Sequence, residues 1–267
     1  MTTTADTPTR IFLLSVTRPK GLAFKNVRVV TSSRQVANAV AGAPLRALWV
    51  AFSSSLLGAL VQQLVGTTAR HWLLDLEPHP RHDFNTLRGI FGEVVPRPAV
   101  VLPIEELVEA LHAPNRADLC IGGTVDRVAE VVSLIRGDLS APIVAPFTDF
   151  GPAPGGPVPD FARFSVEDHG QTLRFGDFQA AVDAVLYEHD PEYRRRINAK
   201  RLAEDRSFGA SLRRLRKQRR LLRTDFPGIS SKTIARIERG EVERPHPHTL
   251  ARIAKVLRVA PHEVASF

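Results

Sequence analysis

Short apolar runs rich in β-branched residues alternate with helix-length segments between residues 27 and 147. Strands that are apolar throughout and separated by helices are typical of parallel sheets covered on both faces. The pattern therefore predicts a doubly wound α/β domain over residues 1–150. We expect its strands at 27–31, 47–52, 71–76, 99–103, 118–123 and 142–147, with an additional strand at 10–16, and its helices at 55–65, 104–112 and 125–135.

This pattern breaks at residue 151. The segment 151–160, "GPAPGGPVPD", holds four prolines and three glycines, which continue neither a strand nor a helix, so we expect a linker. Residues up to 178 then alternate apolar and polar side chains around a central "DHG", which indicates a β-hairpin within the segment 151–189. Asp190 and Pro191 have the pattern of an N-cap and first helical position, which predicts a basic connecting helix in the segment 190–207.

The last part of the chain has apolar positions at helical spacing in several short segments. Short helices joined by tight turns form compact all-helical domains, so we expect one at residues 208–267. Its expected core positions are Leu212, Leu215, Leu221, Phe226, Ile229, Ile234, Ile237, Leu250, Ile253, Ala254, Leu257 and Val259.

Charge divides the chain in the same way. Residues 1–189 hold 16 Lys and Arg against 19 Asp and Glu, a balance of −3, whereas residues 190–267 hold 20 against 9, a balance of +11. A basic domain attached to a slightly acidic one implies a polyanion as the partner of the basic domain alone.

Composition excludes several classes of protein. The single cysteine, Cys120, excludes a disulfide framework and a thiolate zinc cluster, and we expect it to be a core residue. The N-terminus lacks a signal-peptide pattern, and no uncharged apolar run reaches roughly 18 residues. We therefore expect a soluble, cytoplasmic protein without a membrane segment.

The stretch "SSKTIARIERG", residues 230–240, gives the most specific signal. With the helices around it, this stretch resembles the Cro and phage-repressor type of helix-turn-helix family, also called XRE. The resemblance implies that Arg216 and Glu238 form a structural ion pair, and a buried carboxylate requires such a partner. It also places Gly240 at the end of the recognition helix, where a positive φ angle is cheap for glycine.

The sequence departs from the family pattern at several positions. The second helix is shortened by about three residues and carries Pro227-Gly228, so we expect little more than one turn there. Arg223 stands where the family has a glutamine, and Arg258 where a glycine is common. The loop after Gly240 is one residue longer than usual.

The resemblance assigns roles to the polar side chains of this domain, because a recognition helix enters the major groove with its N-terminal residues towards the bases. With Ser230 as N-cap, we expect Ser231, Lys232 and Arg236 to contact bases, with Lys232 or Arg236 donating to guanine O6 and N7. The expected phosphate contacts are Arg219, Arg223, Thr233 and Arg244. His246 and His248 could assist from the loop before the next helix.

The order of the β-α units in the N-terminal domain looks like a flavodoxin-like or receiver arrangement. Residues 71–80 resemble the end of a receiver's third strand, which would place Asp75 at the phosphoacceptor position, and residues 117–137 resemble the fifth strand and its helix. However, Ser32 and Ser33 replace the acidic pair, and no lysine lies near residues 122–123. Phosphotransfer therefore has little support. The resemblance would instead imply a degenerate receiver that senses or dimerises.

Two further segments have some features of a binding site. Residues 71–83 are rich in metal-ligand types, but they cross two prolines, where polar loops are ordinary; the candidates are His71, Asp75, Glu77, His79, His82 and Asp83. Gly122-Gly123-Thr124 at an expected strand-to-helix junction could receive a phosphate, yet it lacks a full glycine-rich motif. We expect no catalytic residue, no metal and no cofactor.

These observations predict a sequence-specific, double-stranded DNA-binding transcriptional regulator that is not an enzyme. We expect a homodimer, because one such module reads only a short half-site. The N-terminal domain would mediate self-association or bind a small-molecule or protein effector. The alternatives are an enzyme guided to DNA, such as a nuclease or a nucleotide-processing protein, and an antitoxin-like repressor that binds a partner protein.

Overall fold

The computed structural model describes residues 10–17, 19, 26–68, 70–77 and 84–266. The chain divides into two compact units, Met1–Asp190 and Pro191–Phe267. The segments 1–150 and 151–189, which the sequence pattern separates, lie together in the first unit. None of the helices in the described part of the chain is long and apolar enough to cross a bilayer.

The first unit opens with a five-stranded parallel sheet of order β2-β1-β3-β4-β5. The predicted strands at 10–16, 27–31, 47–52 and 71–76 all belong to it, whereas the strand β5 was not predicted. Its strands are β1 (Ile11–Leu14), β2 (Val27–Val30), β3 (Leu48–Ala51), β4 (Trp72–Asp75) and β5 (Glu93–Val95), and its helices are α1 (Ser33–Ala41), α2 (Ser54–Leu64) and α3 (Phe84–Arg88).

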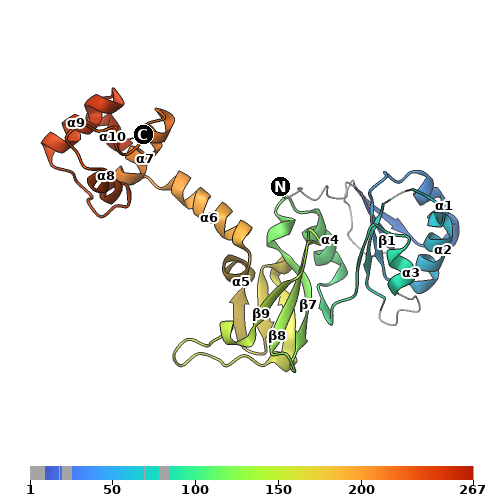
Figure 1. Ribbon diagram of the computed structural model, residues 1–267. Coiled ribbons are helices and arrows are strands. Elements are labelled where there is room, and N and C mark those ends of the chain that lie inside the picture. The colour runs from blue at the N-terminus through green and yellow to red at the C-terminus, as the bar shows by residue number, and fades with distance from the viewer. Residues whose placement is uncertain (1–9, 18, 20–25, 69, 78–83, 267) are drawn as a thin grey trace. The chain divides into compact units, whose positions relative to one another are not determined.

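The three helices pack on one face of this sheet, as Figure 1 shows. Because side chains alternate along a strand, Phe12, Trp49 and Leu73 face the helices and form a core with Leu57 and Leu60 of α2. The strand order matches that of flavodoxin-type sheets. The three described helices share one face, and most of the β1–β2 connection lies outside the described residues, so double winding stays a prediction.

The strands predicted at 99–103, 118–123 and 142–147 do not extend the parallel sheet. They form a separate, antiparallel sheet of order β6-β7-β8-β9, so this part of the prediction is wrong. A buried apolar run fits a parallel or an antiparallel strand equally well, and only its pairing partner decides between them. The strands are β6 (Val100–Val101), β7 (Cys120–Asp126), β8 (Val131–Arg136) and β9 (Ile143–Pro146), and the predicted helix α4 (Ile104–His112) follows β6.

The helix predicted at 125–135 is also wrong, because this segment is the turn and second strand of a β-hairpin. Asp126 Oδ1 accepts hydrogen bonds from the backbone N–H groups of Val128 and Ala129, and Glu130 has a φ angle of 53°. Val128 is 97% exposed at the tip of this turn. The likeness of residues 117–137 to a receiver's fifth strand and helix is lost with this correction.

Gly122 and Gly123 lie within β7 and not at a helix N-terminus. A Cβ atom on Gly122 would lie 2.4 Å from the carbonyl oxygen of Val100, and one on Gly123 would lie 2.7 Å from that of Ser133. These glycines let neighbouring backbones approach closely. The candidate phosphate site required a helix N-terminus, which is not found here. The glycines serve strand packing instead.

A three-stranded antiparallel sheet and one helix complete the first unit. The predicted hairpin forms around its "DHG" turn and gains a third strand, while residues 151–160 contain neither helix nor strand, as predicted. The elements are β10 (Phe164–Glu167), β11 (Thr172–Phe175), β12 (Phe178–Ala181) and α5 (Val182–His189), with single 3₁₀ turns at Arg116–Asp118, Phe147–Asp149, Phe161–Arg163 and Asp168–Gly170.

The second unit is helical. Its helices are α6 (Pro191–Glu204), α7 (Phe208–Gln218), α8 (Ser231–Glu238), α9 (Pro247–Leu257) and α10 (Glu263–Ser266). The predicted apolar stripes meet in one core, in which the buried members are Leu212, Leu215, Phe226, Ile234, Ile237, Ile253, Ala254, Leu257 and Val264.

Gly209, which has no side chain, allows α7 to pack closely against the end of α8. A Cβ atom at this position would lie 2.2 Å from the carbonyl oxygen of Ile237. We therefore expect Gly209→Ala to lower the free energy of unfolding of this unit by about 1–3 kcal/mol. At an ordinary helical position the same change raises stability by up to about 1 kcal/mol. Hydrogen exchange of the α7 and α8 amides measures the effect, and slower exchange in the variant would contradict it.

Candidate nucleic-acid interface

The connection between α7 and α8 is built from turns. The sequence predicted a second helix of little more than one turn, but residues 219–230 contain no helix. Phe226 is buried in the core and anchors the segment, and the side chain of Asp225 accepts a hydrogen bond from the N–H of Leu222 at 2.8 Å. Gly228 has a φ angle of 73°, and its carbonyl accepts a hydrogen bond from Arg252 at 3.1 Å.

The helix α8 begins with a side-chain cap. Ser230 Oγ accepts a hydrogen bond from the N–H of Thr233 at 3.0 Å and lies 2.8 Å from Thr233 Oγ1. This cap satisfies an N–H that has no partner within the helix. Ile234 and Ile237 point into the core, so the orientation of α8 is fixed from both its first turn and its inner face.

The outer face of α8 presents three cations. Lys232 and Arg236 are exposed, as the proposed base contacts require, and Ser231 is exposed beside them. Arg239 is also exposed, and it follows Lys232 by seven residues and Arg236 by three, a spacing that places all three on one side of a helix. Arg239 was not among the predicted contacts, although this spacing is visible in the sequence.

Gly240 ends α8 in a left-handed conformation, with a φ angle of 76°. The N–H of Gly240 donates to the carbonyl of Ile237, and the N–H of Glu241 donates to the carbonyl of Arg236, both at 3.0 Å. These two bonds form a Schellman motif. The motif turns the chain back, so that Glu241 lies over the last turn of the helix.

Glu241 binds both arginines of the outer face. Its Oε1 accepts a hydrogen bond from Arg239 Nε at 2.6 Å, and its Oε2 accepts one from Arg236 Nε at 3.2 Å. The hydrogen bond from Arg239, with that from Arg236, holds the pKa of Glu241 below its ordinary value. The same bond from Glu241 raises the pKa of Arg239. Glu241 and Arg239 are therefore both charged at neutral pH.

Glu238 lies on the opposite face with a side chain only 1% exposed. Arg216 donates to it twice, from Nε to Oε1 at 2.5 Å and from Nη2 to Oε2 at 3.2 Å, and Arg223 Nε donates to Oε2 at 2.9 Å. Burial raises the pKa of Glu238, but the hydrogen bonds and charges of the two arginines outweigh it, so the pKa lies below its ordinary value. The structure thus joins Arg216 to Glu238 and places Arg223 there too, although Arg223 was assigned to phosphate.

The remaining cations of the interface are exposed. Arg219 lies at the C-terminal end of α7, and Arg244 lies in the loop between α8 and α9. Within the described ranges, the side chains of Arg219, Arg244 and Lys232 make no hydrogen bond or ion pair. His246 was considered as an additional DNA contact. In the structure its ring nitrogen accepts a hydrogen bond from the N–H of His248 at 3.3 Å and caps α9.

Comparison with known families decides what this unit is. Residues 207–267 match the model of a family described as a helix-turn-helix domain. The C-terminal unit contains a helix-turn-helix domain. The match supports the resemblance to the XRE type and covers only this part of the chain. No curated protein and no solved structure matches the chain.

Beyond the helix-turn-helix domain, the proposed phosphoacceptor Asp75 is buried at the end of β4. Its Oδ1 accepts a hydrogen bond from the N–H of Glu77 at 3.1 Å, and Glu77 Oε2 accepts one from the N–H of Ser54 at 2.7 Å, where α2 begins. Ser32 and Ser33 lie at the start of α1. These carboxylates are thus engaged with backbone N–H groups.

The candidate metal ligands in this region are only partly described. His71 is buried, its Nδ1 accepts the N–H of Ala47 at 3.2 Å, and burial lowers its pKa. His79, His82 and Asp83 lie outside the described residues. Among the residues that the structure describes, no three His, Cys, Asp or Glu side chains are grouped so that they could hold a metal ion.

Cys120 is a core residue of the first unit. Burial raises the pKa of its thiol to about 12, and its Sγ donates to the carbonyl of Gly122 at 3.2 Å. A thiol with such a pKa is almost entirely protonated at neutral pH, so it is a poor nucleophile.

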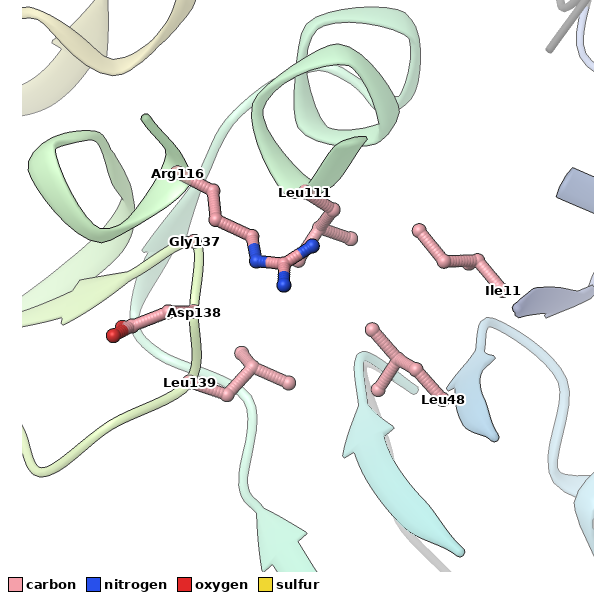
Figure 2. Close-up of a pocket in the computed structure, with 7 residues that line it drawn as sticks. All are labelled: Ile11, Leu48, Leu111, Arg116, Gly137, Asp138 and Leu139. Carbon is pink, nitrogen blue, oxygen red and sulfur yellow. The ribbon is translucent and has the colours of Figure 1, made fainter. Parts of the chain in front are cut away.

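A small pocket lies in the first unit (Figure 2). Its lining is mainly apolar, Arg116 points into it, and Asp138 points away from it. The space that it offers to the centre of a water-sized sphere is about 10 Å³, at the lower limit for one water molecule. It has no room for an effector. Its lining residues are Ile11, Leu48, Leu111, Arg116, Gly137, Asp138 and Leu139.

Proposed function

We propose that the chain is a sequence-specific regulator of transcription that binds double-stranded DNA through its helix-turn-helix domain. The observation that carries the proposal is the outer face of α8, where Lys232, Arg236 and Arg239 are exposed on a helix fixed by its cap and its buried isoleucines. A recognition helix requires such a rigid row of donors, because guanine O6 and N7 accept two hydrogen bonds in a fixed geometry.

The exposed cations around α8 supply the contacts that do not depend on sequence. Arg219 and Arg244 lie before and after α8 in the chain and are exposed, so we assign them to phosphates, with Thr233 at the helix start. Phosphate contacts give affinity and register, whereas base contacts give specificity. Arg223 stays in this set, because only its Nε is bound to Glu238 and its side chain is 42% exposed, so its terminal nitrogens remain available to a phosphate.

The charge of the chain is consistent with this assignment. The balance of +11 over residues 190–267 includes α6, where five Lys and Arg residues lie in a helix of 14 residues. A positive field over one unit attracts DNA at long range and raises the rate of association. The first unit has a balance of −3 over residues 1–189, which does not favour DNA.

For the first unit we propose a role in assembly or sensing and no catalysis. A single helix-turn-helix domain reads a short half-site, and pairing two domains on a two-fold operator raises affinity and specificity. Self-association through Met1–Asp190 would provide that pairing, and a small-molecule or protein effector would act by changing it. The flavodoxin-like strand order of the parallel sheet is compatible with such a role.

The salt dependence of DNA binding tests the proposal. We expect the affinity of the full chain for a duplex of random sequence to fall steeply with salt, because each phosphate contact releases counterions. Arg219→Ala and Arg244→Ala should each make the slope of log K against log salt shallower by about 1. Fluorescence anisotropy with a labelled duplex measures the slope, with Arg34→Ala at an exposed position of the first unit as the matched control. Salt-independent binding, or no binding, would reject the proposal.

A further inference from the structure

The carboxylate of Glu241 follows the end of α8 and contacts the outer face of its last turn. It bonds Arg236 and Arg239 at the same time, one with each oxygen. The three side chains are about half exposed, with values of 44% for Glu241, 52% for Arg236 and 56% for Arg239. A negative charge on a DNA-binding face weakens the attraction to phosphate, so its presence calls for an explanation.

The atoms that Glu241 engages supply that explanation. It accepts the Nε–H of each guanidinium, which leaves the two terminal nitrogens of both arginines to donate elsewhere. Those terminal nitrogens are the fork that binds guanine O6 and N7. A carboxylate that binds Nε therefore fixes the direction in which the two terminal nitrogens point and leaves both of them available to a base.

The backbone makes this arrangement rigid. The Schellman turn at Gly240 fixes Glu241 relative to the last turn of α8, through the bond from its own N–H to the carbonyl of Arg236. Long, flexible arginines lose much rotamer entropy when they bind a base, and side chains that are already ordered lose less. Neither Glu241 nor Arg239 was selected by the sequence analysis.

We infer that Glu241 is a positioning residue for base recognition, which holds Arg236 and Arg239 side by side as a preformed reader of guanine. The inference rests on the proposed DNA-binding function and adds a specificity determinant to it. Glu241 lowers the affinity for DNA of arbitrary sequence, because it holds two arginines away from phosphates. It preserves the affinity for the correct sequence, because the two arginines are already oriented to donate to guanine.

Glu241→Gln is the test, carried out on the full chain with two duplexes. One is the sequence enriched from a random pool by the wild-type chain, and the other is the same duplex with its bases scrambled. We expect the ratio of the two affinities to fall about tenfold in the variant. The slope of log K against log salt for the scrambled duplex should become steeper by about 1–2, as the freed arginines contact phosphates.

Glu243→Gln is the matched control, because Glu243 is an exposed carboxylate two residues further along the same loop. It removes the same charge without touching Arg236 or Arg239, so the ratio of affinities should not change. Circular dichroism checks the folding of both variants, and we expect their spectra to match that of the wild-type chain. An equal rise in affinity for both duplexes, or an unchanged ratio and slope, in Glu241→Gln would overturn the inference while the proposed function stands. A wild-type chain that binds both duplexes equally would overturn both.

Discussion

Glu238→Gln is expected to lower the free energy of unfolding of the helix-turn-helix domain by about 3–5 kcal/mol. The side chain of Glu238 is 1% exposed, and it is the shared partner of Arg216 and Arg223. Removing its charge leaves the guanidinium of Arg216 largely buried without a counter-charge, which costs far more than the pair itself contributes. A domain of this size has on the order of 5 kcal/mol of stability, so the variant should be largely unfolded in this unit.

Hydrogen exchange of the α7 and α8 amides measures this loss. Both tryptophans, Trp49 and Trp72, lie in the first unit, so tryptophan fluorescence does not report on the helix-turn-helix domain. The matched control is Glu243→Gln, an exposed position where we expect a change within about 0.5 kcal/mol. Equal protection of these amides in both variants would show that the buried ion pair is not needed.

The same carboxylate gives the domain a defined pH dependence. The pKa of Glu238 is lower in the folded state than its ordinary value, so the unfolded state binds more protons in the acidic range. Its contribution to stability is therefore complete above the unfolded pKa of about 4.3 and is lost as pH falls through the folded pKa. In the wild-type chain, the protection of the α7 and α8 amides against hydrogen exchange should therefore decrease as pH falls below the unfolded pKa.

The second large effect concerns base reading. Lys232→Ala and Arg236→Ala are each expected to weaken binding to the selected duplex by about tenfold or more, which corresponds to 1–3 kcal/mol for a bidentate contact. Each variant should also lose the preference for one base pair, because the donor that distinguishes it is gone. Quantitative binding to a set of single-base substitutions in the selected duplex measures both effects.

Lys255→Ala is the control for these variants. Lys255 is an exposed lysine on α9, outside the outer face of α8, so its loss should leave the base preferences unchanged. If Lys232→Ala and Arg236→Ala lowered affinity equally for every sequence, the two side chains would be phosphate contacts and their assignment to bases would be wrong.

The sequence predicted most of the helix-turn-helix domain because its signals are local. The isoleucine spacing in α8, the Ser230 cap and the left-handed glycine at Gly240 each follow from residues within one or two turns. The second helix was not predicted correctly. In the structure Phe226 and Gly228 hold the segment in turns, through core packing and a bond from Arg252, which is distant in sequence.

The first unit shows where sequence reasoning fails. The apolar runs of β1, β3 and β4 predicted a parallel sheet, and the equally apolar β7 predicted the same sheet although it pairs antiparallel with β8. Pairing depends on contacts between distant segments, which a single run does not encode. The valines near the β7–β8 turn imitate a helical stripe, and only the Asp126 turn bonds distinguish the two structures.

The site was predicted only in part, because some of its features follow from local spacing and others depend on turns and irregular segments. The side chains that face outward from α8 follow from helical periodicity, so Lys232 and Arg236 were selected. The contact of Glu241 with Arg236 and Arg239 depends on the turn that follows Gly240, and the contact of Arg223 with Glu238 depends on an irregular segment. Neither contact has a fixed sequence spacing that would reveal it.

Selection of bound fragments from a pool of random duplexes tests the central claim most directly. We expect the full-length chain to enrich one sequence motif that contains at least one guanine required for binding, and Lys232→Ala to enrich a different or weaker motif. Enrichment of no motif by the wild-type chain, or of the same motif with the same strength by Lys232→Ala and Arg236→Ala, would contradict the account of α8 as a recognition helix.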